Sequence, residues 1–200
     1  HVNPEITSHE YVANMNNGGQ NISGLFHGTN ITNFASYGNN IVPTLGNIDA
    51  DFIDLNNAAI SNGQDGLVIY PVIGDITGDF IATGGINNDS GVIGDINANF
   101  INNYSGIMND VAYIPSPDNP LAWVASDTLP VIGDISGNFI NNKSNVISNM
   151  GVIGDISGDF IDNHANYGVS TIRNDKTIGN ITGDVINNYV NWDPIYDHGD

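Results

Sequence analysis

The chain repeats one short pattern of apolar and polar positions. Its clearest copy, residues 72–81, reads Val-Ile-Gly-Asp-Ile-Thr-Gly-Asp-Phe-Ile. Positions alternate along this copy, and a period of two residues predicts a β-strand that is buried on one face. The expected core face is Val72, Gly74, Ile76, Gly78 and Phe80, and the expected outer face is Ile73, Asp75, Thr77, Asp79 and Ile81.

Further copies of this pattern occupy most of the sequence. The clear copies are residues 92–101, 131–140, 152–161 and 177–186, and the weaker ones are 19–26 and 45–53. A unit of about 20 residues with short strands, turns and no helix is the size of one coil of a β-solenoid. Stacked coils would align one side chain of every copy in a buried ladder. The residues expected in this core ladder are Phe26, Phe52, Phe80, Phe100, Phe139, Phe160 and Val185.

A second motif, Ile-x-Asn, separates the copies. It occurs at residues 60–62, 86–88, 107–109, 147–149 and 172–174. Asparagine pairs such as Asn102-Asn103 and Asn141-Asn142 follow the long motif and indicate turns, because Asn tolerates a positive φ. Each unit therefore predicts a long strand, an Asn-rich turn, a short strand and a Gly turn.

These repeats predict a single all-β domain over residues 1–200. The expected fold is a parallel β-solenoid of about seven coils with one Pro-rich loop insertion. The expected parts are an N-terminal cap or arm (1–18), the repeats (19–188), the loop insertion (110–130) and a C-terminal tail (189–200). Proline cannot donate a hydrogen bond to a sheet, so the insertion is expected to leave the stack, either as a contact surface or as a packed loop without a binding role.

Composition agrees with a β fold and narrows the function. Isoleucine outnumbers leucine 29 to 6, and 33 Asn and 24 Gly residues supply turns. Three Lys and Arg against 22 Asp and Glu give a net charge of −19. That charge argues against nucleic acid and against anionic membranes, which both need basic residues. The chain has no cysteine and no long apolar run, so we expect neither disulfides nor membrane insertion.

The repeats resemble the passenger repeats of bacterial autotransporter-like surface proteins. Those repeats run as Ile-Gly-Asp-Ile-Thr-Gly-Asp-Phe-Ile, followed by Asn-containing turns. The matching positions begin at Ile73, Ile93, Ile132, Ile153 and Ile178. Residues 59–63 match the Ala-Ile-x-Asn-Ser-Gly connector that joins one repeat of that family to the next. The resemblance covers about residues 19–188 and implies a secreted parallel β-solenoid at a cell surface, in an adhesive or structural role.

Stacked coils would also align acidic residues in two rows. The first row is Asn21, Asn47, Asp75, Asp95, Asp134, Asp155 and Asn180, and the second is Asp51, Asp79, Asn99, Asn138, Asp159 and Asp184. Neighbouring carboxylates repel, and Ca²⁺ bound by their oxygens would relieve the repulsion. One interpretation is therefore a calcium row at Asp75, Asp95, Asp134 and Asp155. Solvated turn aspartates, with Asn ladders that hydrogen-bond between coils and no cofactor, are the competing interpretation.

Catalytic patterns are missing from the sequence. The five histidines have no metal-ligand spacing, no serine lies in a Gly-x-Ser-x-Gly motif, and three basic residues are few for a lyase on a β-helix. We therefore expect no catalytic residues and a non-enzymatic protein, either a surface adhesin or an extracellular fibre subunit. A carbohydrate-active enzyme or carbohydrate-binding module, and a calcium-dependent structural module, are the alternatives.

The two ends of the stack suggest a partner. An end coil exposes strand backbone groups that need hydrogen-bond partners, and neither terminus predicts an amphipathic capping helix. We expect the ends to bind another copy, by head-to-tail stacking or strand exchange that yields filaments. A cell-surface or glycan ligand is the other expected partner.

Overall fold

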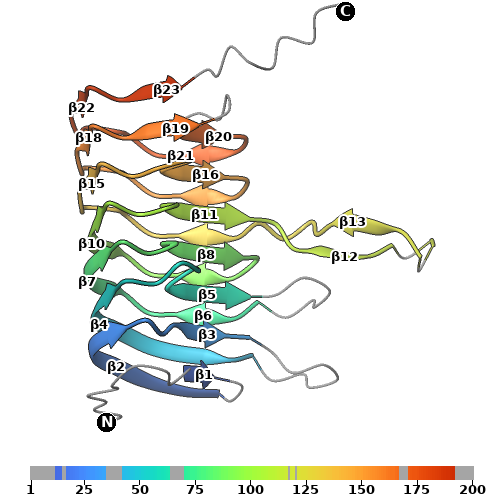
Figure 1. The fold of residues 1–200 in the computed structure, drawn as a ribbon. Coiled ribbons are helices and arrows are strands. Elements are labelled where there is room, and N and C mark those ends of the chain that lie inside the picture. Colours follow the sequence, from blue (N-terminus) through green and yellow to red (C-terminus); the bar gives the residue numbers. More distant parts are fainter. Residues whose placement is uncertain are drawn as a thin grey trace, which may run out of the picture.

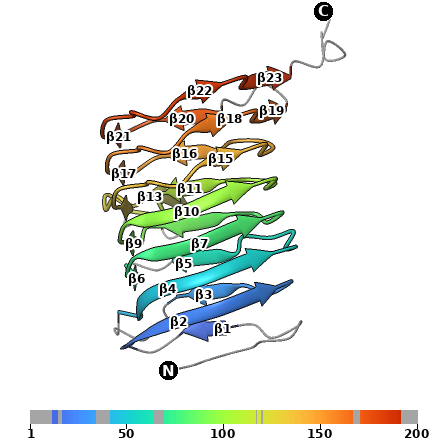
Figure 2. The same ribbon diagram turned by 90° about the vertical axis from the view of Figure 1, so that its left-hand side faces the viewer.

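The computed structural model describes residues 12–14, 17–34, 42–63, 70–116, 118–119, 121–166 and 171–191. Within these ranges every regular element is a β-strand, and most neighbouring strands are parallel. This confirms the predicted all-β fold with parallel sheets and is consistent with a β-solenoid. Figures 1 and 2 show the chain rising in stacked levels from its N-terminal to its C-terminal end.

One sheet collects short strands with an apolar residue two positions before an asparagine. Its seven strands are parallel and in register, so that Ile60 lies beside Ile86 and Ile86 beside Ile107. β-Branched residues suit this arrangement because they pack well on a pleated surface. In order across the sheet, the strands are β1 (Val12–Asn14), β3 (Ile31–Asn33), β5 (Ile60–Gly63), β8 (Ile86–Asp89), β11 (Ile107–Asp110), β16 (Ile147–Asn149) and β20 (Ile172–Asn174).

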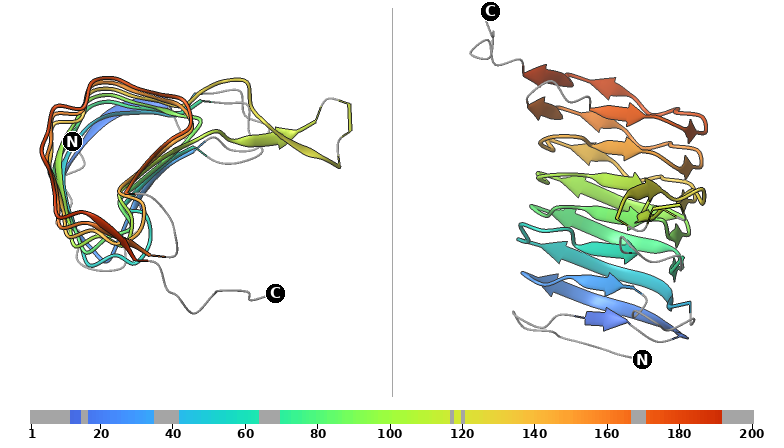
Figure 3. Two further views of the ribbon diagram at one scale, coloured as in Figure 1. Left: turned by 90° about the horizontal axis from the view of Figure 1, so that it is seen from above. Right: turned by 90° about the vertical axis from the view of Figure 1, so that its right-hand side faces the viewer.

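The long motif forms the other large sheet. It is one long strand in β2 (Asn17–His27) and β4 (Thr44–Ile53), and two shorter strands in each later level. The first of these shorter strands are β6 (Val72–Ile73), β9 (Val92–Ile93), β14 (Val131–Ile132), β17 (Val152–Ile153) and β21 (Thr177–Ile178). The second are β7 (Ile76–Ile81), β10 (Ile96–Ile101), β15 (Phe139–Ile140), β18 (Phe160–Ile161) and β22 (Val185–Ile186). Seen from above, the levels superpose around a common interior (Figure 3).

A corner within the long motif corrects one prediction. In residues 72–81, two residues separate β6 from β7. Ile73, Ile76 and Phe80 are buried, whereas Val72 is only half-buried. The prediction that Val72 faces the core and Ile73 faces solvent was therefore wrong. Side chains alternate strictly only along an unbroken strand, and the corner shifts the alternation so that two residues three positions apart point inward.

A second corner follows the Phe-Ile pair that ends most copies of the long motif, and the Val185-Ile186 pair of the last copy. The residue after the pair has φ between 52° and 56°, in the left-handed region. Asn and Asp are the non-glycine residues that adopt this conformation most readily, which explains the Asn-rich turns of the sequence. The residues at this corner are Asp54, Ala82, Asn102, Asn141, Asp162 and Asn187.

Two further strand pairs lie outside the large sheets. β12 (Tyr113–Pro115) and β13 (Trp123–Ala125) pair antiparallel and project away from the stack (Figures 1 and 3). β19 (His164–Asn166) and β23 (Tyr189–Asn191) pair in parallel beside the C-terminal levels. The described part of the chain contains no helix long and apolar enough to cross a membrane.

The terminal regions are described only in part. Within the expected cap or arm (1–18), residues 12–14 form β1 and residues 17–18 begin β2, while the rest lie outside the described residues. Within the expected tail (189–200), residues 189–191 form β23 and the others lie outside them. Pro117 and Pro120 of the loop insertion also lie outside the described residues.

Candidate functional surfaces

The predicted core ladder lies inside the stack. Its six phenylalanines are fully buried, and successive ring centroids are 4.8 to 5.0 Å apart with interplanar angles of 6° to 23°. This separation matches the roughly 4.8 Å between neighbouring strands of a sheet, so the backbone spacing sets the ring spacing. Val185 needs a correction: it pairs in register with Phe160 but is 65% exposed, because it belongs to the last level of the stack.

The first acidic row is a ladder of hydrogen bonds along the stack. The side-chain Oδ1 of each member accepts the backbone N–H of the corresponding residue in the next level, at 2.7 to 3.0 Å. For example, Asp95 Oδ1 accepts from Asp134 N–H, and Asp134 Oδ1 accepts from Asp155 N–H. Asn21 and Asn47 accept in the same way at the start of the row. The repeated Asp therefore provides an acceptor, and an amide oxygen serves equally well.

The second acidic row is bonded in a similar way. Asp51 accepts the N–H of Asp79, and Asp159 accepts the N–H of Asp184, both at 2.8 Å. Between Asp79 and the next level the donor is a side chain instead of a backbone N–H: Asn99 Nδ2 donates to Asp79 Oδ1 at 2.8 Å. Both rows thus join consecutive levels to one another.

The described residues do not form a metal cage. Asp75, Asp95, Asp134 and Asp155 are exposed side chains in a line, one in each level. No group of three or more His, Cys, Asp or Glu in the described residues is close enough to hold a metal ion. Calcium prefers six to eight oxygen ligands, and a single-file row does not converge on a point.

A buried asparagine ladder runs through the sheet of short strands. Each Nδ2 donates to the Oδ1 of the asparagine in the next level at 2.8 to 2.9 Å. Asn33, Asn62, Asn88, Asn109 and Asn149 are fully buried, and Asn174 ends the ladder. The Ile-x-Asn motif predicts a short strand, but neither the burial of its asparagine nor the further copy at residues 31–33 was predicted from the sequence. Alternation was the available signal, because residues two apart in a strand share a face.

A second asparagine ladder lies at the left-handed corner. Asn142 Nδ2 donates to Asn163 Oδ1 at 2.9 Å, and Asn163 Nδ2 donates to Asn188 Oδ1 at 2.8 Å. The same Nδ2 groups donate to phenylalanine carbonyls of the preceding levels. The ladder therefore bonds both to the next level and to the backbone of the preceding one.

The projecting hairpin carries an aromatic face. The register pairs Tyr113 with Ala125 and Pro115 with Trp123, so these four residues share one side of the ribbon. Tyr113 is 46% exposed and Trp123 is 57% exposed. Two large aromatic rings on one side of a two-stranded ribbon form a candidate contact surface.

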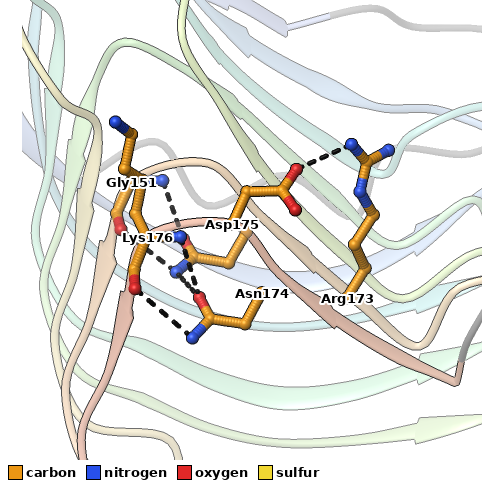
Figure 4. Close-up of polar contacts among 6 residues, drawn as sticks. Gly151, Arg173, Asn174, Asp175 and Lys176 are labelled. Atoms are coloured by element: carbon orange, nitrogen blue, oxygen red, sulfur yellow. Dashed lines mark hydrogen bonds and ion pairs between the residues drawn. The ribbon is translucent and has the colours of Figure 1, made fainter.

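The C-terminal level, residues 171–191, is the other candidate contact surface. Ile181, Val185 and Ile186 are 43%, 65% and 44% exposed. Figure 4 shows polar contacts of the same level: Arg173 and Asp175 form an ion pair at 2.6 Å, and Asn174 Oδ1 accepts the N–H of Lys176 at 3.3 Å. This level combines exposed core-type side chains with charges of both signs.

In comparisons with known proteins, no family model, no curated protein and no solved structure matches this chain.

Proposed function

We propose that the chain is a secreted, non-enzymatic β-solenoid of about seven coils, with residues 110–130 as a loop insertion. In this proposal it works at the cell surface, as an adhesin or as a subunit of an extracellular fibre. The observation that carries the proposal is the use of the repeated polar residues. Both acidic rows and both asparagine ladders bond one level to the next.

Repeated residues with a structural role argue for a scaffold. A catalytic site needs a few groups in distinct environments within a cleft. Here the same Asp recurs level after level in the same exposed environment and accepts the same N–H. The arrangement favours a stiff rod whose task is to hold contact surfaces in fixed positions.

The proposed partners follow from the exposed surfaces. A second copy of the chain suits an open end of the stack, because such an end offers unpaired strand edges. A cell-surface or glycan ligand suits the projecting hairpin. The net charge of −19 supports an extracellular setting without nucleic acid.

A polysaccharide panel tests the proposal directly. The full chain is incubated with neutral and acidic polysaccharides while reducing ends and unsaturated products are measured. Light scattering and retention on the immobilised polysaccharides are followed in parallel. We expect self-association or retention without any product. Product release that Asp134→Asn or Asp159→Asn abolishes would overturn the structural role and support a carbohydrate-active enzyme.

Glycan binding by the hairpin is the second candidate function. Aromatic rings on one exposed face are the usual platform for stacking against the apolar faces of sugar rings, and Tyr113 and Trp123 supply two. Trp123→Ala is expected to weaken retention by about tenfold, which corresponds to about 1.4 kcal/mol. Leu121→Ala is the matched control, because Leu121 is exposed but not aromatic. Equal retention of both variants and the parent chain would exclude the hairpin as the glycan site.

A further inference from the structure

The two ends of the stack differ in how well their apolar residues are covered. In the N-terminal level, Ile22 is 5% exposed and Phe26 is fully buried. In the C-terminal level, Ile181 is 43% exposed and Val185 is 65% exposed. The two pairs occupy equivalent positions of the motif, so the difference belongs to the ends and not to the residues. Among the described residues of the two end levels, core-type side chains are exposed to solvent in the C-terminal one.

The strands of the C-terminal level also form sheet edges. β20 and β21 stand last in their sheets, and β22 pairs with β18 alone among the described strands. Their outer backbone groups are therefore in position to pair with a further strand. An apolar surface next to an open strand edge is the usual arrangement at an assembly contact.

Charge distinguishes the C-terminal level from the rest of the molecule. Residues 171–191 contain Arg173 and Lys176 against Asp175 and Asp184, so this level is neutral in a chain of net charge −19. It holds two of the three basic residues of the protein. The N-terminal level, residues 17–34, contains no Lys, Arg, Asp or Glu. Of the two described end levels, the C-terminal one carries both signs of charge.

We propose that the C-terminal level binds the C-terminal level of a second copy, related by a two-fold axis. An isologous contact must complement itself, and a surface with exposed apolar side chains and both signs of charge meets that requirement. The described N-terminal level, residues 17–34, has neither exposed core residues nor opposite charges, so it is the poorer partner. The proposal rests on the proposed function in taking another copy as the partner. It differs in the product, since a two-fold contact closes and yields a dimer instead of a filament.

The contact is small and the charge of the whole molecule opposes it. The end face of one level is small compared with the roughly 1,600 Å² of surface that a standard protein–protein interface buries. We therefore expect a weak, concentration-dependent dimer. Long-range repulsion between two copies falls as salt shortens the Debye length. Dimerisation is therefore expected to strengthen as salt rises.

Sedimentation equilibrium on the full chain tests the contact. Concentrations from roughly 10 µM to 1 mM are compared in about 0.5 M NaCl, where exposed charges are strongly screened. The parent chain is expected to form dimers and nothing larger. Val185→Asp is expected to weaken them by about tenfold or more, because it places a carboxylate in an apolar contact. Leu25→Asp is the matched control. Leu25 is exposed in the N-terminal level, and its register partner in the next level, Asp51, is already an aspartate.

Single cysteines locate the contact independently of affinity. The chain has no cysteine of its own, so one engineered thiol reports one position. Thr182 and Ser23 are exposed residues at equivalent positions of the motif, in the C-terminal and N-terminal levels. A short thiol cross-linker is expected to join Thr182→Cys to itself and to leave Ser23→Cys uncoupled.

The other outcomes separate the two proposals. Cross-links between Ser23→Cys and Thr182→Cys, in assemblies larger than a dimer that Leu25→Asp disrupts, would show head-to-tail stacking; they overturn the two-fold contact but support the fibre. A monomer at every concentration overturns the two-fold contact and the fibre, and it remains compatible with a monomeric adhesin.

Discussion

At Gly137 the chain approaches the level before it so closely that no side chain fits. A Cβ built there would lie 1.6 Å from the carbonyl oxygen of Ala98, a backbone atom that cannot turn aside. The next level repeats the contact, with 1.8 Å between a Cβ on Gly158 and the carbonyl oxygen of Gly137. The second glycine of the motif therefore serves the contact between levels.

Replacing Gly137 with Ala is expected to destabilise the protein by about 3 kcal/mol, because one level must move away from the next. Urea unfolding followed by circular dichroism measures the change. Ala98→Gly, in the same column, is the control and should cost only about 1 kcal/mol through backbone entropy. A loss for Gly137→Ala no larger than the loss for the control would show that the levels can separate at little cost.

The acidic row makes a separate prediction for Asp134. Asp134→Asn keeps the oxygen that accepts the Asp155 N–H and removes a charge, so stability should change by less than about 0.5 kcal/mol. Asp134→Ala removes the acceptor and should cost about 1–2 kcal/mol. Chelation with EDTA is expected to leave the melting temperature of the parent chain unchanged. A drop on chelation that Asp134→Asn abolishes would instead establish the calcium row.

At the scale of elements, the asparagine ladders bind strands that belong to different levels. Asn109 of β11 accepts from Asn88 of β8 and donates to Asn149 of β16, both at 2.8 Å. Buried amides are costly unless paired, and here each amide is paired with its neighbours along the ladder. The ladder therefore also specifies register, because a one-residue slip would move every asparagine to the outer face.

Substituting Asn109 with Leu should destabilise the protein by about 2–4 kcal/mol. The change removes the bonds that Asn109 makes with Asn88 Nδ2 and Asn149 Oδ1, and the bonds that its Nδ2 donates to two backbone carbonyls. Each lost hydrogen bond costs roughly 0.5–1.5 kcal/mol. Asn97→Leu, at an exposed position of β10, is the comparison and should change stability by less than about 0.5 kcal/mol. Thermal and urea unfolding of both variants measure the two losses of stability. Similar losses would mean that the buried ladder does not stabilise the fold more than an exposed asparagine does.

At the scale of the whole molecule, the negative charge is concentrated in the inner levels of the stack, and it affects the stability of the fold. Residues 42–63 carry three aspartates and no basic residue, and residues 70–91 carry three more, whereas the levels at 17–34 and 171–191 have no net charge. Like charges at neighbouring levels repel and oppose the compact state. The backbone hydrogen bonds that these aspartates accept hold them in place despite the repulsion.

Salt should therefore stabilise the fold. Raising NaCl from about 10 mM to about 0.5 M reduces the Debye length from roughly 30 Å to a few ångströms. We expect the melting temperature to rise by about 3 °C or more, close to 1 kcal/mol for a chain of this length. A double variant, Asp95→Asn with Asp134→Asn, retains both acceptors and should respond less. A melting temperature that falls with salt would show that repulsion between levels is not the dominant electrostatic effect.

Much of the fold follows from local pattern. Alternation is a property of a single strand, so Ile76 and Phe80 fall on one face whatever lies around them. Repetition of the same strand predicts parallel stacking, because equal units bury their apolar faces best against copies of themselves. The prevalence of Ile over Leu, and of Asn and Gly, points to strands and turns without any knowledge of the neighbours.

The sequence by itself determined strand content, repetition and in-register pairing. The first follows from the pattern within one unit, and the other two follow from the likeness of one unit to the next. Tertiary structure alone decided which way Val72 and Ile73 point, since the corner between β6 and β7 resets the alternation. It also decided that the exposed Asp134 accepts a backbone N–H and that Val185 lies open to solvent. The Asp134 bond depends on a group in the adjacent level, 21 residues away along the chain, and Val185 is exposed because no further described level covers it.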